Sequence, residues 1–174
     1  NITMYHGANV IGSEFNITNL GTLLTDDTHT FNVYANDTSG NNNYTESVSF
    51  TFENTNVDSC RTLDKAGTVY TLTDDVTTTG DCFTISADNI TLEGAGKTVD
   101  GDDSSGDEGV IVSGKLNVTI RNLIITDFGK GIYFTAGTNN SLIKNNNISS
   151  GQDGIYLDGN SKDNEIVDNN SSLN

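Results

Sequence analysis

Few residues in this sequence combine the types and the spacing that catalysis or metal binding requires. The two histidines, His6 and His29, have no spacing to the cysteines that resembles a zinc motif. The acidic segment at 101–109 offers the oxygen ligands that calcium prefers, but it lacks the sixth-position glycine of an EF-hand loop. We expect a solvated loop there rather than an ion site. If an ion binds, its candidate ligands are four carboxylates in or beside this segment: Asp100, Asp102, Asp103 and Asp107.

The two cysteines, Cys60 and Cys82, lie 22 residues apart in an otherwise cysteine-free chain. An isolated pair of this kind, in a chain rich in Asn-x-Ser/Thr, is typical of one disulfide in an oxidising compartment. Two buried free thiols are the alternative. The pair favours an extracellular or cell-surface location.

The composition predicts an all-β protein with many turns. The chain has 174 residues, no proline, 33% hydrophobic residues and a formal net charge of −16 at pH 7. Threonine favours strands, whereas glycine, asparagine and aspartate favour turns. The negative charge argues against nucleic acid and anionic membranes as partners. No apolar run approaches the ~20 residues of a membrane span, and the opening residues do not form a signal peptide, so we expect a processed or excised piece.

The first part of the chain, residues 1–55, has the alternating pattern of strands. Apolar residues fall at every second position in 15–20, 28–37 and 45–54, with turn residues between them. The segment THTFNVYANDTSGNNNYTESVSFTF resembles the last two strands of bacterial and archaeal Ig-like or fibronectin-like domains. Such a domain has about seven strands, whereas about four are found here. The resemblance therefore implies an incomplete Ig-like β-sandwich.

The second part, residues 56–174, repeats itself every 20-odd residues. Its apolar triplets are FTI (83–85), VIV (110–112), IYF (132–134) and IYL (155–157), and the last steps between their central residues are 22 and 23. The 101–109 segment lengthens the first step. A repeat of this length with no helical pattern predicts a β-solenoid.

The opening coil of this second part carries a family resemblance. Its markers are Cys60, Leu63, Ala66-Gly67, Tyr70-Thr71-Leu72, then Cys82, Phe83 and NITL at 89–92. The stretch 60–174 resembles the right-handed parallel β-helix of pectin-lyase-like surface proteins, archaeal ones in particular. The resemblance implies the fold well and an activity poorly.

The residues that the enzymes of such folds use are missing from the repeat region. Polygalacturonase-like hydrolases pair aspartates with a Gly-His-Gly and an Arg-x-Lys, and neither motif occurs here. Asp153, in GQDGIYL, is the remaining acid, and we interpret it as a turn residue entering a strand. Arg121 is the one arginine after the first coil, so a lyase would lack its usual cation. We therefore predict that the chain is not an enzyme.

Asparagine recurs in register along the repeats, and ten Asn-x-Ser/Thr sequons occur in the chain. Asparagine tolerates the left-handed conformation and can bond to its equivalents in neighbouring coils. Two ladders with inward side chains are predicted: Asn89, Asn117, Asn140, Asn164; and Asn122, Asn145, Asn169. Sequons outside these ladders are the predicted glycosylation sites: Asn36 and Asn43 first, then Asn16, Asn139, Asn147 and Asn1.

These observations predict a non-enzymatic extracellular structural protein that forms part of a surface layer, fibre or filament. Its partners would be N-glycans and further copies of itself in a head-to-tail homopolymer, because the sandwich lacks strands and the solenoid lacks a cap. No cofactor is expected. The alternative is a carbohydrate-binding or carbohydrate-processing β-helix module of a larger secreted protein. A line of aromatic residues with carboxylates would favour that alternative; Tyr133 and Tyr156, at equivalent repeat positions, are expected to be buried or stacked.

Overall fold

The computed structural model describes all residues except 1, 7–8, 13–26, 37–41, 53 and 174. The chain divides into two compact units, Asn1–Asn54 and Thr55–Asn174, one residue from the boundary that the sequence predicts. The described residues form strands and turns and no helix, so the prediction of an all-β protein is confirmed. This part of the chain accordingly holds no helix long and apolar enough to cross a membrane.

The first unit is an antiparallel sheet in the order β2-β1-β3-β4. Thr30 and Ser49 face each other across the β3–β4 pair with their hydroxyl oxygens 2.8 Å apart. β3 and β4 match the strands predicted at 28–37 and 45–54, whereas the strand predicted at 15–20 lies outside the described residues. Among the residues described, this sheet has no second sheet packed on it. Its strands are β1 (Ile2–His6), β2 (Asn9–Gly12), β3 (Asp27–Asn36) and β4 (Asn42–Phe52).

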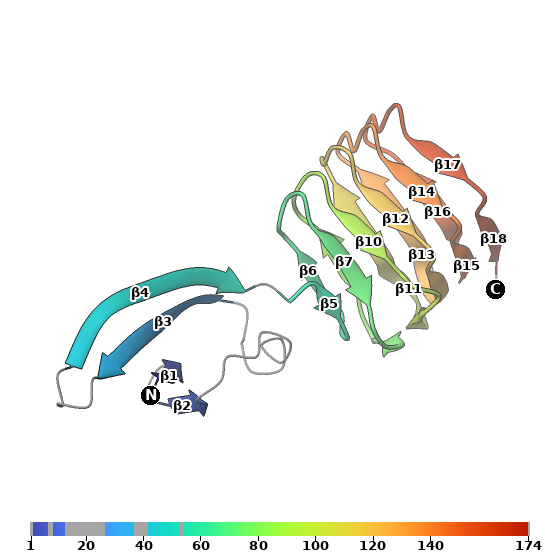
Figure 1. Cartoon of the computed structure of the whole chain (residues 1–174). Helices are drawn as coiled ribbons and strands as arrows, with labels where there is room; N and C mark the ends of the chain where they lie inside the picture. Colours follow the sequence, from blue (N-terminus) through green and yellow to red (C-terminus); the bar gives the residue numbers. More distant parts are fainter. Residues whose placement is uncertain (1, 7–8, 13–26, 37–41, 53, 174) are drawn as a thin grey trace. The chain divides into compact units, whose positions relative to one another are not determined.

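The second unit is a β-helix of about five coils, and each complete coil has three sides (Figure 1). The first side is a parallel sheet of β5 (Asn56–Val57), β7 (Val69–Leu72), β10 (Thr91–Glu93), β12 (Thr119–Arg121), β14 (Leu142–Lys144) and β17 (Glu165–Val167). The second and third sides share one bent sheet, because β11 (Thr98–Ser113) and β13 (Ile124–Thr135) run through the corner between them. The second side adds β8 (Val76–Thr77), β15 (Asn147–Ser150) and β18 (Asn170–Leu173). The third side adds β6 (Arg61–Leu63), β9 (Phe83–Ile85) and β16 (Asp153–Leu157).

The interior of the β-helix consists of columns of aliphatic and aromatic side chains in register. On the first side Leu92, Ile120 and Ile143 pair directly and are fully buried. Successive residues of a strand point in opposite directions, so one faces the core and the next faces outward. On the third side the inward residues are the first and third of each triplet, such as Val110 and Val112. Each such side chain contributes roughly 1.5–3 kcal/mol by burial. The predicted alignment of the third-side triplets is confirmed, because Thr84, Ile111, Tyr133 and Tyr156 pair in succession.

Asparagines turn the corners on both edges of the first side. Asn89, Asn117 and Asn140 have φ of 59°, 56° and 54° before the strand, and Asn122 and Asn145 have φ of 58° and 55° after it. The left-handed conformation costs asparagine less than most residues. Of the predicted ladders, one side-chain bond is seen: Nδ2 of Asn117 donates to Oδ1 of Asn89 at 2.8 Å.

Two features of the ladders were predicted wrongly. The register slips by one residue in the last coil, where Asp163 and Asp168 hold the positive φ and Asn164 and Asn169 follow them. Asp and Asn both accept this conformation, so residue identity alone does not fix the register. The corner side chains also do not point inward: Asn89, Asn117, Asn140 and Asn145 are exposed.

The residues that do point inward after the corners become polar in the later coils. Leu123 is followed one coil on by Asn146, which is 2% exposed, and then by Asn169. Nδ2 of Asn146 donates to the Ile120 carbonyl at 3.1 Å and to Oδ1 of Asn169 at 3.0 Å, and its Oδ1 accepts from the Leu123 amide at 3.1 Å. These bonds offset the cost of burying an amide. The sequence patterns missed this column because they search for apolar residues at interior positions.

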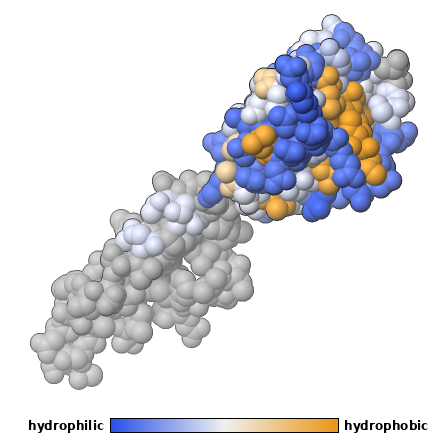
Figure 2. Space-filling view, turned by 90° about the horizontal axis from the view of Figure 1, so that it is seen from above, coloured by the Kyte–Doolittle hydropathy of each residue, from blue (hydrophilic) through white to orange (hydrophobic). Residues whose placement is uncertain are grey.

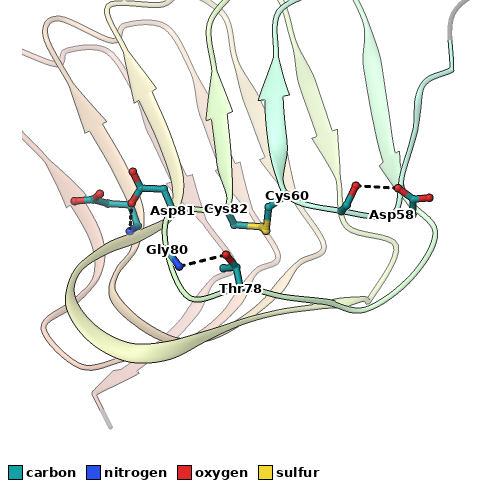
Figure 3. Close-up of a disulfide and its surroundings, with 8 residues drawn as sticks. Asp58, Cys60, Thr78, Gly80, Asp81 and Cys82 are labelled. Atoms are coloured by element: carbon teal, nitrogen blue, oxygen red, sulfur yellow. Dashed lines mark hydrogen bonds between the residues drawn. A yellow bond between two sulfur atoms is a disulfide. The ribbon is translucent and has the colours of Figure 1, made fainter.

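Cys60 and Cys82 form the predicted disulfide, with Cα atoms 4.4 Å apart (Figure 3). The bond connects the starts of β6 and β9, which neighbour each other on the third side. Cys82 is 4% exposed. The disulfide therefore ties the first two coils together at the edge of that side.

Candidate functional site

The outer surface of the third side carries a row of side chains, one from each coil, and the later ones are larger. Thr84, Ile111, Tyr133 and Tyr156 are the central residues of four successive strands, and the residues on both sides of Ile111 and of Tyr133 are buried. Alternation therefore points these central residues to solvent. Tyr156 is 37% exposed. The β-helix surface is mostly hydrophilic in the view of Figure 2, with hydrophobic groups collected in patches.

Tyr133 and Tyr156 form an aromatic pair, and the carboxylate of Asp158 holds Tyr133 in place by a hydrogen bond. Their ring centroids are 5.5 Å apart and the ring planes are tilted by 34°. Oη of Tyr133 donates to Oδ2 of Asp158 at 3.0 Å, and Oγ1 of Thr135 donates to Oδ1 of the same carboxylate at 2.6 Å. Tyr133 and Tyr156 were expected to be buried or stacked. They are stacked on each other, on the outside of the coil.

A row of charged residues runs beside the tyrosines, one from each coil. Lys130 pairs in register with Glu108 and with Asp153, and its Nζ lies 3.1 Å from Oε1 of Glu108. The same Nζ lies 5.0 Å from the ring centre of Tyr133 and 5.9 Å from that of Tyr156, a cation–π arrangement. The Glu108 amide donates to Oδ1 of Asp81 at 2.9 Å. Lys130 therefore links the carboxylates to the aromatic pair.

Burial and neighbouring charges change the proton affinity of this row. The pKa of Glu108 is raised above its ordinary value of 4.5, mainly by desolvation; Asp81 adds to the rise, whereas Lys130 opposes it. The pKa of Lys130 is raised, first by its hydrogen bond to Glu108, so its ammonium group stays charged at neutral pH. The side chains of Lys130 and Glu108 are 21% and 12% exposed, so water only partly screens the pair.

The first side carries a different outer surface on the same coils. Nε of Arg121 lies 2.6 Å from Oε2 of Glu93, and Nδ2 of Asn122 donates to both oxygens of that carboxylate at 2.9 and 3.1 Å. Desolvation raises the pKa of Glu93, but the hydrogen bonds from Asn122, the Ala95 amide and Arg121 together hold it below 4.5. With both carboxylate oxygens of Glu93 occupied, this cluster is suited to holding coils together.

The outer surfaces of the first and third sides thus differ in the groups that they offer a ligand. Tyrosine rings present apolar faces to a flat ligand, and the neighbouring carboxylates and hydroxyls accept or donate hydrogen bonds. That combination suits sugar rings, whose C–H faces stack and whose hydroxyls need polar partners. No group of three or more His, Cys, Asp or Glu side chains in the described ranges is arranged to hold a metal ion.

The calcium candidates have other contacts in the structure. Oδ1 of Asp100 accepts from Oγ1 of Thr126 at 2.5 Å, and Oδ1 of Asp102 accepts from the Ser104 amide at 3.1 Å. Asp103 turns the chain with φ of 64°. Asp107 lies in the same strand, β11.

The predicted glycosylation sites are spread over both units. Asn1 and Asn16 lie outside the described residues, and Asn36 and Asn43 lie in β3 and β4. Oδ1 of Asn139 accepts from the Lys162 amide at 2.6 Å, and Oδ1 of Asn147 accepts from Nδ2 of Asn170 at 2.9 Å. None of these residues lies in the tyrosine row or in the charged row. The residues of the charged row were not predicted as a site, because they belong to a corner rather than to a motif, and Asp153 was interpreted as a turn residue.

Comparison with known proteins agrees with this geometry at the level of the fold. A family model described as "Right handed beta helix region" matches residues 83–174. Neither the curated proteins nor the solved structures contain a match to the chain. Because the matched stretch is more than half of the chain, this protein belongs to the right-handed β-helix family.

Proposed function

We propose that this chain is an extracellular carbohydrate-binding β-helix module without catalytic activity, and that its ligand lies on the outer face of the third side. The observation that carries the proposal is the stacked pair Tyr133–Tyr156 with Asp158 bonded at its edge. Aromatic residues in a row with carboxylates beside them would favour a carbohydrate module over a plain scaffold, and the pair Tyr133–Tyr156 with Asp158 supports the proposal in that sense.

Charge narrows the class of sugar. The face carries the carboxylates Asp81, Glu108, Asp153 and Asp158, and its Lys130 is already paired with Glu108. A polyuronic acid would meet repulsion from this row and from the chain's net charge of −16. Neutral or amino-sugar polymers fit the face better.

Two observations support the extracellular and non-catalytic parts of the proposal. The disulfide Cys60–Cys82 suits an oxidising compartment. Glu108 and Asp81 are two neighbouring acids that could be compared with a catalytic pair. Glu108 is ion-paired with Lys130, however, and Asp81 accepts a hydrogen bond from the Glu108 amide. A general acid or base needs an oxygen that reaches the substrate.

The role in a surface fibre is the second candidate. The strands of the first side pair in register from one coil to the next, as a rigid scaffold requires. Assembly head-to-tail, an Ig-like identity for the first unit, and an archaeal or bacterial surface-protein origin stay predictions. Sedimentation and electron micrographs of the purified chain would show fibres if this candidate is right.

The carbohydrate proposal is tested by a binding screen with soluble polymers of three charges: a neutral glucan, a partly deacetylated chitin and a polygalacturonate. Affinity electrophoresis measures binding, and chromatography of the reducing ends measures cleavage. We expect retardation by the neutral or amino-sugar polymer, none by polygalacturonate, and no cleavage of any. Retardation by none of the three, or release of oligosaccharides, contradicts the proposal.

A further inference from the structure

Four of the sequons in the β-helix form two in-register pairs on its outer surface. Asn117 follows Asn89 one coil later, and the sequon threonines, Thr91 and Thr119, pair directly in the first-side sheet. On the second side, Asn147 pairs with Asn170, and Ser149 pairs with Ser172. All four asparagines are exposed. In each sequon the asparagine and the hydroxyl residue lie two positions apart in the chain, so both point outward while the residue between them points inward.

Within each pair the two amides have different roles. Nδ2 of Asn117 donates to Oδ1 of Asn89 at 2.8 Å, and Nδ2 of Asn170 donates to Oδ1 of Asn147 at 2.9 Å. Asn89 and Asn147 therefore use their oxygen for the contact and keep their nitrogen for solvent. The nitrogen is the atom that an N-linked glycan occupies.

Two other sequons in the β-helix are closed by packing. Ser141, the hydroxyl residue of the Asn139 sequon, is 3% exposed, and its Oγ donates to the Asn139 carbonyl at 3.0 Å. Nδ2 of Asn169 donates to the carbonyls of Ile143 and Val167 at 2.8 and 3.0 Å. A glycan on Asn169 would have to replace these bonds in the stack. The fold therefore disfavours sugar at both sites.

We propose that Asn89 and Asn147 are the N-glycosylation sites of the β-helix, one for each pair. The donor is an oligosaccharide linked to a lipid diphosphate: the bond from C1 of the sugar to the diphosphate oxygen breaks, and a bond from C1 to Nδ2 forms. The amide loses one proton, and the lipid diphosphate leaves. Neighbouring coils are only ~4.8 Å apart, so a second glycan at the equivalent position of the next coil would collide with the first. This assignment differs from the sequence prediction, which excluded Asn89 and favoured Asn139.

The test is site-by-site mapping of the whole chain secreted from a glycosylating eukaryotic host. Enzymatic removal of the glycan converts a modified asparagine to aspartate, and peptide mass spectrometry then reads each site. We expect conversion at Asn89 and Asn147 and none at Asn139 or Asn169. The variants Thr91→Ala and Ser149→Ala should each remove one glycan, whereas the matched variants Thr119→Ala and Ser172→Ala should leave the occupancy of Asn89 and Asn147 unchanged.

Three outcomes would overturn the proposal: no conversion at Asn89 and Asn147, conversion at Asn117 or Asn170 in their place, or conversion at Asn139 or Asn169 in folded protein. If a variant is not secreted, the wild-type map decides alone, because it reads all six sites in one sample. None of these outcomes depends on carbohydrate binding at the third side.

Discussion

The outer faces of the first and third sides rest on the same coils, yet each shifts the pKa of a partly buried carboxylate in the opposite direction. On the first side, Glu93 receives hydrogen bonds from Arg121 and Asn122, and its pKa is lowered. On the third side, desolvation and Asp81 raise the pKa of Glu108 despite Lys130. Glu93 holds neighbouring coils together, whereas Glu108 holds Lys130 beside the rings of Tyr133 and Tyr156. The difference teaches that function in this fold lies in the outward residues, because the inward ones repeat.

The comparison depends on a shared interior, and truncation there should have the largest effect. Phe134 is fully buried, directly after the outward Tyr133. We expect Phe134→Ala to lower the free energy of unfolding by about 3–5 kcal/mol through lost burial and a cavity. Tyr133→Ala should cost about 1 kcal/mol or less, because its ring lies on the outer surface and its loss leaves no cavity in the core. Urea unfolding followed by circular dichroism measures both, and equal losses would contradict the division into inward and outward residues.

The disulfide is the next largest contribution, and it belongs to the third side. A closed loop of 22 residues is expected to stabilise the folded chain by about 3 kcal/mol through the entropy of the unfolded state. The double variant Cys60→Ser/Cys82→Ser should lose about that amount in thermal unfolding. Adding reductant should shift the wild type in the same direction and leave the variant unchanged. An unchanged wild-type midpoint under full reduction would show that the bond does not support the fold.

The third prediction compares the two carboxylates by pH, with effects of roughly 1 kcal/mol or less. The lowered pKa of Glu93 gives stability that is present above its ordinary value of 4.5 and is lost as the pH falls through its folded-state value. Glu93→Gln should therefore be less stable than wild type at pH 7, and the two should converge in acid.

Glu108 should behave in the opposite sense. Its pKa is raised above 4.5, so the neutral form is favoured in the folded state, and that advantage is lost as the pH rises through the folded-state value. Glu108→Gln should be at least as stable as wild type at pH 7, with the difference disappearing below pH 4.5. Stability curves of the same sign for both variants would remove the contrast between the faces.

The sequence predicted the β-helix and the register of its third side because the apolar triplets repeat at nearly constant spacing. The predicted register of the asparagines was wrong at Asn164 and Asn169, because Asp163 and Asp168 occupy the corner positions with positive φ. The apolar residue Ile166, rather than the asparagine, fixes the register there, since it pairs with Ile143.

The candidate site could be predicted only in part. The equivalence of Tyr133 and Tyr156 was evident, but Glu108 lies in the insertion of irregular length, where it meets Lys130 and Asp81 from the two neighbouring coils. Their meeting depends on how the 101–109 insertion is absorbed within β11, and no repeat pattern encodes that. The disulfide pairing was accessible because only two cysteines exist.

The most direct test of the central claim is the affinity of the third side for sugar with and without its rings. Isothermal titration of the polymer that binds best in the screen should give at least a tenfold loss for Tyr133→Ala/Tyr156→Ala, because each stacked ring typically contributes about 0.5–1.5 kcal/mol or more. The matched first-side variant Arg121→Ala/Leu142→Ala should bind as the wild type does. If the first-side variant loses affinity and the tyrosine variant keeps it, the ligand does not lie on the third side.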